Sequence, residues 1–398
     1  MPDEALSRTG VTLRRAGADD AVAGVRPRWV ALPESVEEIA AVLRACAEHD
    51  LAVVPAGGGT KLHWGHPPER CDVLLDLCCM NEILEHAAGD LVVRVQAGVT
   101  MSALAETLAG EGQELALDVP FTEHTTVGGT LATATDGPRA FRHGGARDLL
   151  IGITVVLPDG TIARSGGKVV KNVAGYDLGK LFTGSYGTLG VIAEATFRLH
   201  PLPADRRWLV AETRAAELSD DLLGALAAAQ AEPAAVEIDC LDGRQATLAV
   251  LVEGAAAEQR ALALRDVLGR GTLTTEPPEW WGLVLNDDLL IELRFPPACA
   301  GRVLAEVAGT GFSPRGSSAR GRFRLELWGD IEPGALNAAV AGLRERLEPL
   351  GGRVVVLATP HDDVDRWGQV SALPLMRRVK ERFDPGRRMS PGRFTGGI

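Results

Sequence analysis

The sequence lacks the features of a membrane-spanning, secreted or nucleic-acid-binding protein. No apolar run approaches the roughly 18 residues that a spanning helix needs, and the first residues contain no apolar segment of a signal peptide. Its 53 Asp and Glu outnumber its 41 Lys and Arg, which gives a net charge of −12. Because that charge repels a phosphate backbone, we expect no nucleic-acid partner. Because an apolar run and a signal peptide are missing, we expect no transmembrane segment and a cytoplasmic location.

Cysteine and histidine are too sparse for a metal centre. The six cysteines stand at positions 46, 71, 78, 79, 240 and 299 and form no C-x-x-C-x-x-C run, so no cubane iron–sulfur cluster is expected. Cys71, Cys78 and Cys79 are interpreted as small buried side chains in a reducing compartment. His63 and His66 offer only two ligands, so we expect no metal site.

What the sequence does contain is a chain of 398 residues whose pattern changes near Pro203. This length is enough for two or three domains. We expect an irregular N-terminal arm over residues 1–25, an α+β domain over 26–203, a second α+β domain over 204–370 and a segment over 371–398. In the second domain, strands near 207–212, 234–240, 246–253, 288–295, 322–328 and 353–357 alternate with helices near 218–230, 256–268, 298–308 and 333–348. This order favours two ferredoxin-like halves, and the last segment is expected to return to the first domain as a basic helix.

A β-α-β unit begins the first domain. Residues 29–32 and 51–54 are apolar enough for strands, and the helix between them begins with a capping box of Ser35 and Glu38. The crossover makes the two strands parallel. The loop Pro55-Ala56-Gly57-Gly58-Gly59-Thr60 follows at the carboxyl end of the second strand, where ligands of α/β units bind. Three successive glycines expose N–H groups, which favours a diphosphate cradle over an ordinary tight turn.

Three more stretches of small residues follow in the same domain. Residues 125–132 are expected to form a loop that contains threonine hydroxyls and the pair Gly128-Gly129, and residues 137–148 form a Gly- and Arg-rich tract. Gly184, Gly187 and Gly190 precede a strand over 191–199, and a β-hairpin is expected over 151–163. The spacing fits neither a Rossmann turn nor a Walker loop. Four such loops in one domain indicate a large buried nucleotide.

These loops resemble the motifs of the vanillyl-alcohol oxidase family, also called PCMH-type FAD-binding proteins. The family's P-A-G-G-G-T stands at residues 55–60 and its T-x-G-G at 126–129. Its Y-G-x-x-R-D stands at 143–148 with His143 in the Tyr position, and its G-S-E-G-T-L-G-V-I at 184–192 with Tyr186 in the Glu position. The resemblance implies an α+β fold, in which a two-part FAD-binding domain carries an α+β ferredoxin-like cap domain.

The resemblance also implies which residues bind FAD. These are Pro55, Ala56, Gly57, Gly58, Gly59, Thr60, Pro120, Thr126, Val127, Gly128, Gly129, Gly137, Gly144, Asp148, Gly187, Gly190, Val191 and Ile192. Some relatives attach the flavin covalently through a histidine in the first loop. Thr60 stands in that position here, so the resemblance implies non-covalent FAD, although His63 is close by.

Within this family, the run Lys171–Leu178 is similar to the glycolate oxidase flavin subunits, and the whole chain is most similar to the GlcE type. Phe383-Asp384-Pro385 and Pro391–Phe394 resemble the family's F-D-P…N-P-G-R ending, with Ser390 in the Asn position. The resemblance implies a complex that oxidises glycolate, or another small 2-hydroxy acid, to the keto acid. It implies a second flavin subunit and an iron–sulfur subunit as partners, with peripheral association at the inner face of the cytoplasmic membrane through the complex.

The expected catalytic groups are missing from the second domain. The resemblance implies that the large subunits of this family contain an H-x-G-D-G-N-x-H motif. Only Leu327–Asp330 remains of this motif here, without the histidines. Arg294 and Arg324 could bind a substrate carboxylate or form a solvated strand face. Three hypotheses therefore stay open: a subunit for electron transfer or assembly, a self-sufficient 2-hydroxy-acid dehydrogenase, and a flavin-free structural or sugar-nucleotide-binding protein.

Overall fold

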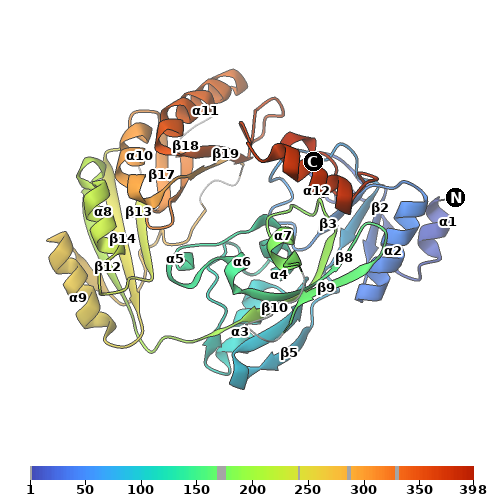
Figure 1. Cartoon of the computed structure of the whole chain (residues 1–398), viewed down its shortest axis with the longest axis horizontal. Coiled ribbons are helices and arrows are strands. Elements are labelled where there is room, and N and C mark those ends of the chain that lie inside the picture. Colours follow the sequence, from blue (N-terminus) through green and yellow to red (C-terminus); the bar gives the residue numbers. More distant parts are fainter. Residues whose placement is uncertain (1, 168–175, 241–242, 285–287, 328–330) are drawn as a thin grey trace. The chain divides into compact units, whose positions relative to one another are not determined.

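The computed structural model of the chain describes residues 2–167, 176–240, 243–284, 288–327 and 331–398. It divides into two compact units (Figure 1). Unit 1 consists of Met1–Asp136, Gly145–Leu202 and Val370–Ile398, and unit 2 consists of Gly137–Gly144 and Pro203–Gln369. Residues 171–175 of the run Lys171–Leu178 lie outside the described residues. Residues 328–330 of the motif remnant lie outside them as well.

The first sheet of unit 1 contains the expected β-α-β unit. Strand β2 (Trp29–Leu32), helix α2 (Val36–Glu48) and strand β3 (Val53–Ala56) follow one another, and Ser35 caps α2 by accepting from the Glu38 N–H. The Glu38 carboxylate accepts from the Glu34 N–H rather than from Ser35. The order is β1-β2-β4-β3, and both β2 and β3 pair in parallel with β4 (Val73–Asp76).

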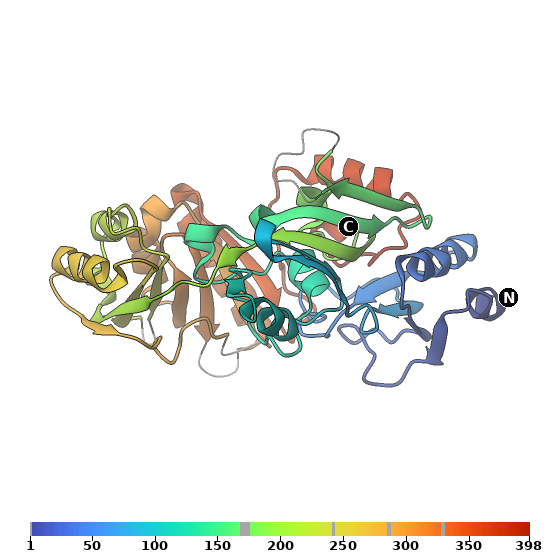
Figure 2. The ribbon, with the colours of Figure 1, turned by 90° about the horizontal axis from the view of Figure 1, so that it is seen from below.

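The N-terminal residues are more regular than expected. Helix α1 (Pro2–Ser7) lies beside α2 (Figure 2), and strand β1 (Thr12–Arg15) pairs antiparallel with β2. Leu6 is fully buried and belongs to the main core of unit 1. The segment is less irregular than expected because a partner strand and one buried side chain order residues that are otherwise polar.

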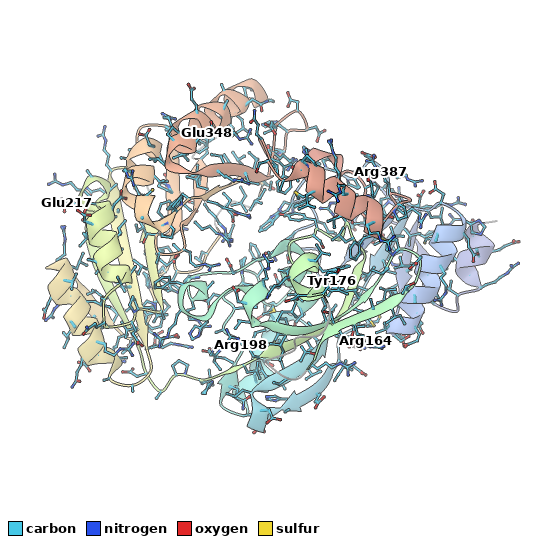
Figure 3. All side chains as sticks on the ribbon, viewed as in Figure 1. Arg164, Tyr176, Arg198, Glu217, Glu348 and Arg387 are labelled. Carbon is cyan, nitrogen blue, oxygen red and sulfur yellow. The ribbon has the colours of Figure 1, made fainter. Side chains whose placement is uncertain are left out.

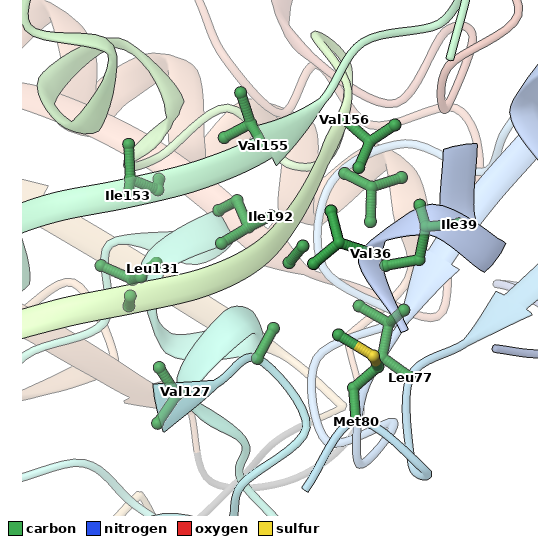
Figure 4. Packing of buried hydrophobic residues seen from close by; sticks show 14 of the residues in the cluster. Val36, Ile39, Leu77, Met80, Val127, Leu131, Ile153, Val155, Val156 and Ile192 are labelled. Atoms are coloured by element: carbon green, nitrogen blue, oxygen red, sulfur yellow. The ribbon is translucent and has the colours of Figure 1, made fainter. Parts of the chain in front are cut away.

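The second sheet of unit 1 is antiparallel, with the order β5-β6-β10-β8-β9. The hairpin of β8 (Leu150–Val156) and β9 (Ile162–Gly166) was predicted from the sequence, as was β10 (Val191–Arg198). Side chains of α2, α4 and both sheets meet in one hydrophobic core (Figure 4). The remaining elements of unit 1 are β5 (Ile83–Ala87), β6 (Val92–Gln96), α3 (Met101–Ala109), β7 (Gln113–Glu114), α4 (Val127–Thr133), α6 (Ala146–Leu149), α7 (Leu178–Phe182), β11 (His200–Pro201) and α12 (Leu373–Phe383).

Unit 2 consists of two βαββαβ repeats in one sheet, together with the short helix α5 (Ala140–His143). The first repeat contains β12 (Arg206–Arg214), α8 (Asp220–Ala227), β13 (Ala235–Asp239), β14 (Gln245–Glu253), α9 (Ala257–Leu268) and β15 (Thr272–Thr274). The second contains β16 (Leu290–Arg294), α10 (Ala300–Val307), β17 (Phe312–Ser317), β18 (Arg322–Leu327), α11 (Pro333–Leu347) and β19 (Arg353–Ala358).

The strand order of this sheet is β15-β12-β14-β13-β17-β18-β16-β19, and every pairing is antiparallel. Each repeat therefore has the ferredoxin-like order 4-1-3-2, and the two join edge to edge through β13 and β17. The two expected halves are confirmed. Strand β17 was not predicted, because its sequence contains Pro314 and Gly316, which disfavour strands.

The two faces of this sheet differ in character. Helices α8 to α11 lie on one face (Figure 1), where alternate side chains such as Ile238, Leu248 and Phe323 form the core. The residues between them in sequence point to the opposite face and include Asp239, Glu292 and Arg315, all buried. We call this opposite face the polar face of unit 2.

Candidate functional site: a glycine-walled cleft in unit 1

The centre of the cleft is the loop that follows β3. Strand β3 ends at Ala56, and Gly57, Gly58, Gly59 and Thr60 come directly after it. Within the described chain, the N–H groups of these four residues donate no hydrogen bond to a protein acceptor. Successive free N–H groups form a concave positive surface that suits an anion.

The glycines are required because two loops touch here. A Cβ atom on Gly58 would lie 1.6 Å from the carbonyl oxygen of His124, and one on Gly57 would lie 2.1 Å from Oγ1 of Thr126. No side chain fits in either place, so only glycine lets residues 57–58 lie against residues 124–126. The sequence predicted glycine for approach to a ligand, and the structure adds approach to the neighbouring loop.

The second wall is a helix rather than the expected loop. Residues 127–133 form α4, and Thr126 is its N-cap, with Oγ1 accepting from the Gly129 N–H at 3.2 Å. A Cβ on Gly128 would lie 2.9 Å from the Cβ of Ala97, so this glycine lets α4 pack closely against the residue after β6. The loop expectation was wrong because the Thr126 cap and this packing override the low helix propensity of the two glycines.

The third wall is the turn before β10. Gly187 has φ +71° and Gly190 has φ +152°, both in the region that favours glycine. Tyr186, which stands between Gly184 and Gly187, also has a left-handed backbone, with φ +55°. Its N–H donates to the Ala132 carbonyl oxygen. A non-glycine residue in this conformation is held there by its surroundings.

The C-terminal segment completes the cleft. Its backbone pairs in parallel beside β3. The Val53 N–H donates to the Arg388 carbonyl oxygen, and the Ser390 N–H donates to the Val53 carbonyl oxygen. Arg393 is buried and donates to the carbonyl oxygens of Leu62 and Trp64, each at 2.7 Å. Nearby, Arg387, labelled in Figure 3, forms an exposed ion pair with Glu69 at 3.3 Å.

Lys380 of α12 holds this segment against the turn before β10. Its ammonium donates to the carbonyl oxygen of Thr188, to Oδ2 of Asp384 and to the carbonyl oxygen of Met389, at 2.8, 2.7 and 2.9 Å. Asp384 is fully buried and also accepts from the N–H groups of Arg388 and Met389. Burial lowers the pKa of Lys380, although the neighbouring Asp384 opposes this.

The cleft opens to solvent, and the space between its walls, open solvent included, amounts to about 760 Å³. The predicted residues that line it are Pro55, Ala56, Gly57, Gly58, Gly59, Thr60, Thr126, Gly128, Gly129, Gly187, Gly190 and Ile192. Sequence reasoning missed Lys61, Leu62, Leu77, Ala97, Ala132, Thr133, Tyr186 and Arg393, which also line it. Lys61 directly follows the glycine loop, and Arg393 stands in the Pro391–Phe394 ending that resembles a family motif, so both had a usable signal.

The other predicted FAD contacts do not line this cleft. Val127 and Val191 are buried in the core, the Pro120 carbonyl oxygen accepts from Thr125, and the Asp148 carboxylate accepts from the Gly145 N–H. Gly137 and Gly144 belong to unit 2. Direct contact of these six residues with FAD stays a prediction.

Among the buried carboxylates of unit 2 that have arginine partners, Glu253 and Glu292 have lowered pKa values. Burial alone would raise the pKa of Glu253, but a hydrogen bond from His143 and the charges of Arg139 and Arg206 bring it to about 2. This cluster fastens residues 137–144 to β14. On the polar face, burial alone would likewise raise the pKa of Glu292, but the charges of Arg322, Arg294 and Arg324 bring it to about 2.

Comparison with known proteins agrees with the cleft. The profile of a family described as "FAD binding domain" matches residues 27–166. Among solved structures, an alkyldihydroxyacetonephosphate synthase superposes on 92% of this chain and 76% of its own, with a TM-score of 0.68 and 18% identity. A chitooligosaccharide oxidase covers 97% of both chains, with a TM-score of 0.66 and 17% identity. The fold is the expected α+β PCMH-type fold, and FAD is the cofactor.

Sequence relatives include a glycolate oxidase subunit and D-lactate dehydrogenases. The chain is 36% identical to "Glycolate oxidase subunit GlcD" of Bacillus subtilis over 211 residues, which are 53% of this chain and 45% of the relative. It is 36% identical to "D-lactate dehydrogenase [cytochrome] 1, mitochondrial" of Saccharomyces cerevisiae over 45% of this chain and 30% of the relative. It is 39% identical to "D-lactate dehydrogenase" of Anaerostipes hadrus over 45% and 37%. These matches thus span less than half the length of each relative.

The residues present fit FAD. A diphosphate needs donors without bulky side chains, and the free N–H groups of Gly57–Thr60 supply them. When bound, FAD supplies the chemistry of hydride and electron transfer, and the protein supplies its binding and orientation. In the described part of the chain, no helix is long and apolar enough to cross a membrane, and no cluster of three or more metal-ligating side chains is found.

Proposed function

We propose that the chain is the FAD-binding subunit of a glycolate oxidase complex, of the GlcE type. It binds FAD non-covalently and works with a second flavin subunit and an iron–sulfur subunit that together oxidise glycolate to glyoxylate. Its own FAD serves electron transfer or assembly. Through the complex it associates with the inner face of the cytoplasmic membrane.

The observation that carries this proposal is an FAD cleft combined with a second unit whose two histidines both contact acceptors through Nε2. Oxidation of a 2-hydroxy acid requires a base for the hydroxyl proton. Unit 2 contains His143 and His361. His143 contacts Glu253 at 3.2 Å, and Nε2 of His361 contacts the Ile331 carbonyl oxygen at 3.0 Å. Both histidines are thus already engaged, which supports oxidation of the substrate on another subunit.

A second candidate is a self-sufficient FAD-dependent 2-hydroxy-acid dehydrogenase. The observation in its favour is the arginine group on the polar face of unit 2, where Arg294, Arg322 and Arg324 lie near the carboxylate of Glu292. Arginine side chains suit a carboxylate substrate, because a guanidinium can donate to both carboxylate oxygens. The relatives named as D-lactate dehydrogenases support the same class of substrate.

Purification of the tagged chain from its host separates the two candidates. The complex predicts that a second flavoprotein and an iron–sulfur protein copurify, and that only this assembly reduces a dye with glycolate. If the isolated chain oxidises glycolate at the rate of the assembly, the subunit role is refuted. If Arg294→Met and Arg324→Met then abolish that turnover, the self-sufficient enzyme is supported.

A further inference from the structure

Lys61 is a buried cation at the cradle of the cleft. It follows Gly57–Thr60 directly, lines the cleft and is only 8% exposed. Lysine is rarely buried to this extent, because taking an ammonium out of water is costly unless its surroundings stabilise the charge. The surroundings of Lys61 therefore decide what its charge can do at this position.

The contacts of Lys61 place its charge among hydroxyl groups. Nζ lies 3.2 Å from Oγ1 of Thr60 and 3.2 Å from Oγ1 of Thr125, and the two hydroxyls are themselves 3.2 Å apart. Oγ1 of Thr125 donates to the Pro120 carbonyl oxygen, so this hydroxyl presents its lone pairs to the ammonium. The Trp64 ring, 5.9 Å from Nζ, adds a weak cation–π interaction.

The segment after Lys61 is fixed by a second buried cation. Arg393 donates to the carbonyl oxygens of Leu62 and Trp64, and the Leu62 N–H donates to the Gly59 carbonyl oxygen. The Trp64 N–H in turn donates to the carbonyl oxygen of Lys61. The backbone of Lys61 is thus held by hydrogen bonds on both sides. The position of its charge is therefore pre-organised, unlike that of a lysine on a flexible surface.

We propose that Lys61 supplies the positive charge that stabilises the FAD diphosphate in the cleft. The N–H groups of Gly57–Thr60 give direction to the phosphate oxygens, and the Lys61 ammonium adds a full charge in a place of low dielectric. Lys61 is a binding residue for the cofactor, and Arg393 is a positioning residue for Lys61. This inference rests on FAD as the cofactor and not on the substrate or the complex.

The test compares Lys61→Met and Lys61→Arg with Lys180→Met, whose exposed lysine forms an ion pair with Asp177 in the same unit. We expect Lys61→Met to weaken FAD binding to the apoprotein by about 10- to 100-fold, which is the usual effect of one charged hydrogen bond. Lys61→Arg should retain most of the affinity, and Lys180→Met should leave it unchanged. Melting of the apoproteins shows whether each variant is folded.

A second readout is the ³¹P spectrum of FAD bound at saturation. If the ammonium stabilises the diphosphate, Lys61→Met shifts the two phosphorus resonances and Lys180→Met does not. An unchanged ³¹P spectrum in Lys61→Met refutes the proposal even if affinity falls, because the loss is then a general distortion of the loop. Equal FAD affinity in wild type and Lys61→Met refutes it as well.

Discussion

Replacement of Lys380 by methionine removes the charge that connects α12, the turn before β10 and the C-terminal segment. The ammonium is about 5% exposed and its partner Asp384 is fully buried. Methionine keeps most of the apolar chain of lysine, so the loss is mainly that of three charged hydrogen bonds. The carboxylate of Asp384 then stays buried with two N–H donors only.

The size of the effect follows from that stranded carboxylate. Removal of one partner of a buried ion pair costs about 3–5 kcal/mol in the free energy of unfolding. Asp384 keeps its two backbone donors, so we expect a value near the lower limit, about 3 kcal/mol. Thr188 lies between Gly187 and Gly190, and Met389 pairs with Val53 of β3, so the cleft also loosens and FAD dissociates faster.

The assay is urea unfolding of the holoprotein followed by flavin fluorescence, with Lys180→Met as the matched control. Lys180 also pairs with an aspartate, the N-cap Asp177 of its own helix, but both side chains are 54% exposed. Loss of this ion pair therefore costs about 0–1 kcal/mol in the free energy of unfolding. Lys380→Met combined with Asp384→Asn should recover part of the loss, because the stranded charge is gone. If Lys380→Met costs no more than Lys180→Met, the reasoning is refuted.

Two further changes probe the cleft and unit 2. Gly58→Ala places a Cβ 1.6 Å from the His124 carbonyl oxygen, so we expect FAD affinity to fall more than tenfold. Gly89→Ala, whose Cβ would have nothing within 4 Å, should leave the affinity unchanged. Equal FAD titration curves for the two variants would contradict this. Glu253 has its pKa lowered to about 2 from 4.5, so its stabilisation is complete above about pH 4.5 and is lost as pH falls toward 2. Glu253→Gln should therefore destabilise unit 2 by on the order of 3 kcal/mol at neutral pH and hardly at all at pH 2, as measured by denaturation at several pH values; a pH-independent difference would count against the cluster.

Local sequence patterns were enough to predict the elements that depend on neighbours in the chain. The capped helix α2, the hairpin of β8 and β9 and the glycine loop after β3 follow from periodicity and turn residues. The two ferredoxin-like halves follow from the order of strands and helices in the same way. Patterns of this kind fail where a contact between distant residues overrides them.

Three features of the molecule are of that second kind. Residues 127–133 form a helix although two glycines stand in its first turn, because Gly128 packs against Ala97. The edge-to-edge pairing of β13 with β17 joins strands of separate repeats, and β17 contains Pro314. Arg393 reaches Leu62 across 331 positions in sequence. No local pattern encodes such contacts, whereas the burial of Lys61 could have been suspected from its place after the glycine loop.

The central claim is that the cleft of unit 1 holds one FAD without a covalent bond. Its most direct test is acid precipitation of the purified chain after incubation with excess FAD and removal of unbound flavin. We expect one FAD per chain in the supernatant and none in the precipitate, with less FAD retained by Gly58→Ala. Flavin that stays with the precipitated protein, or a wild-type chain that retains none, would contradict it.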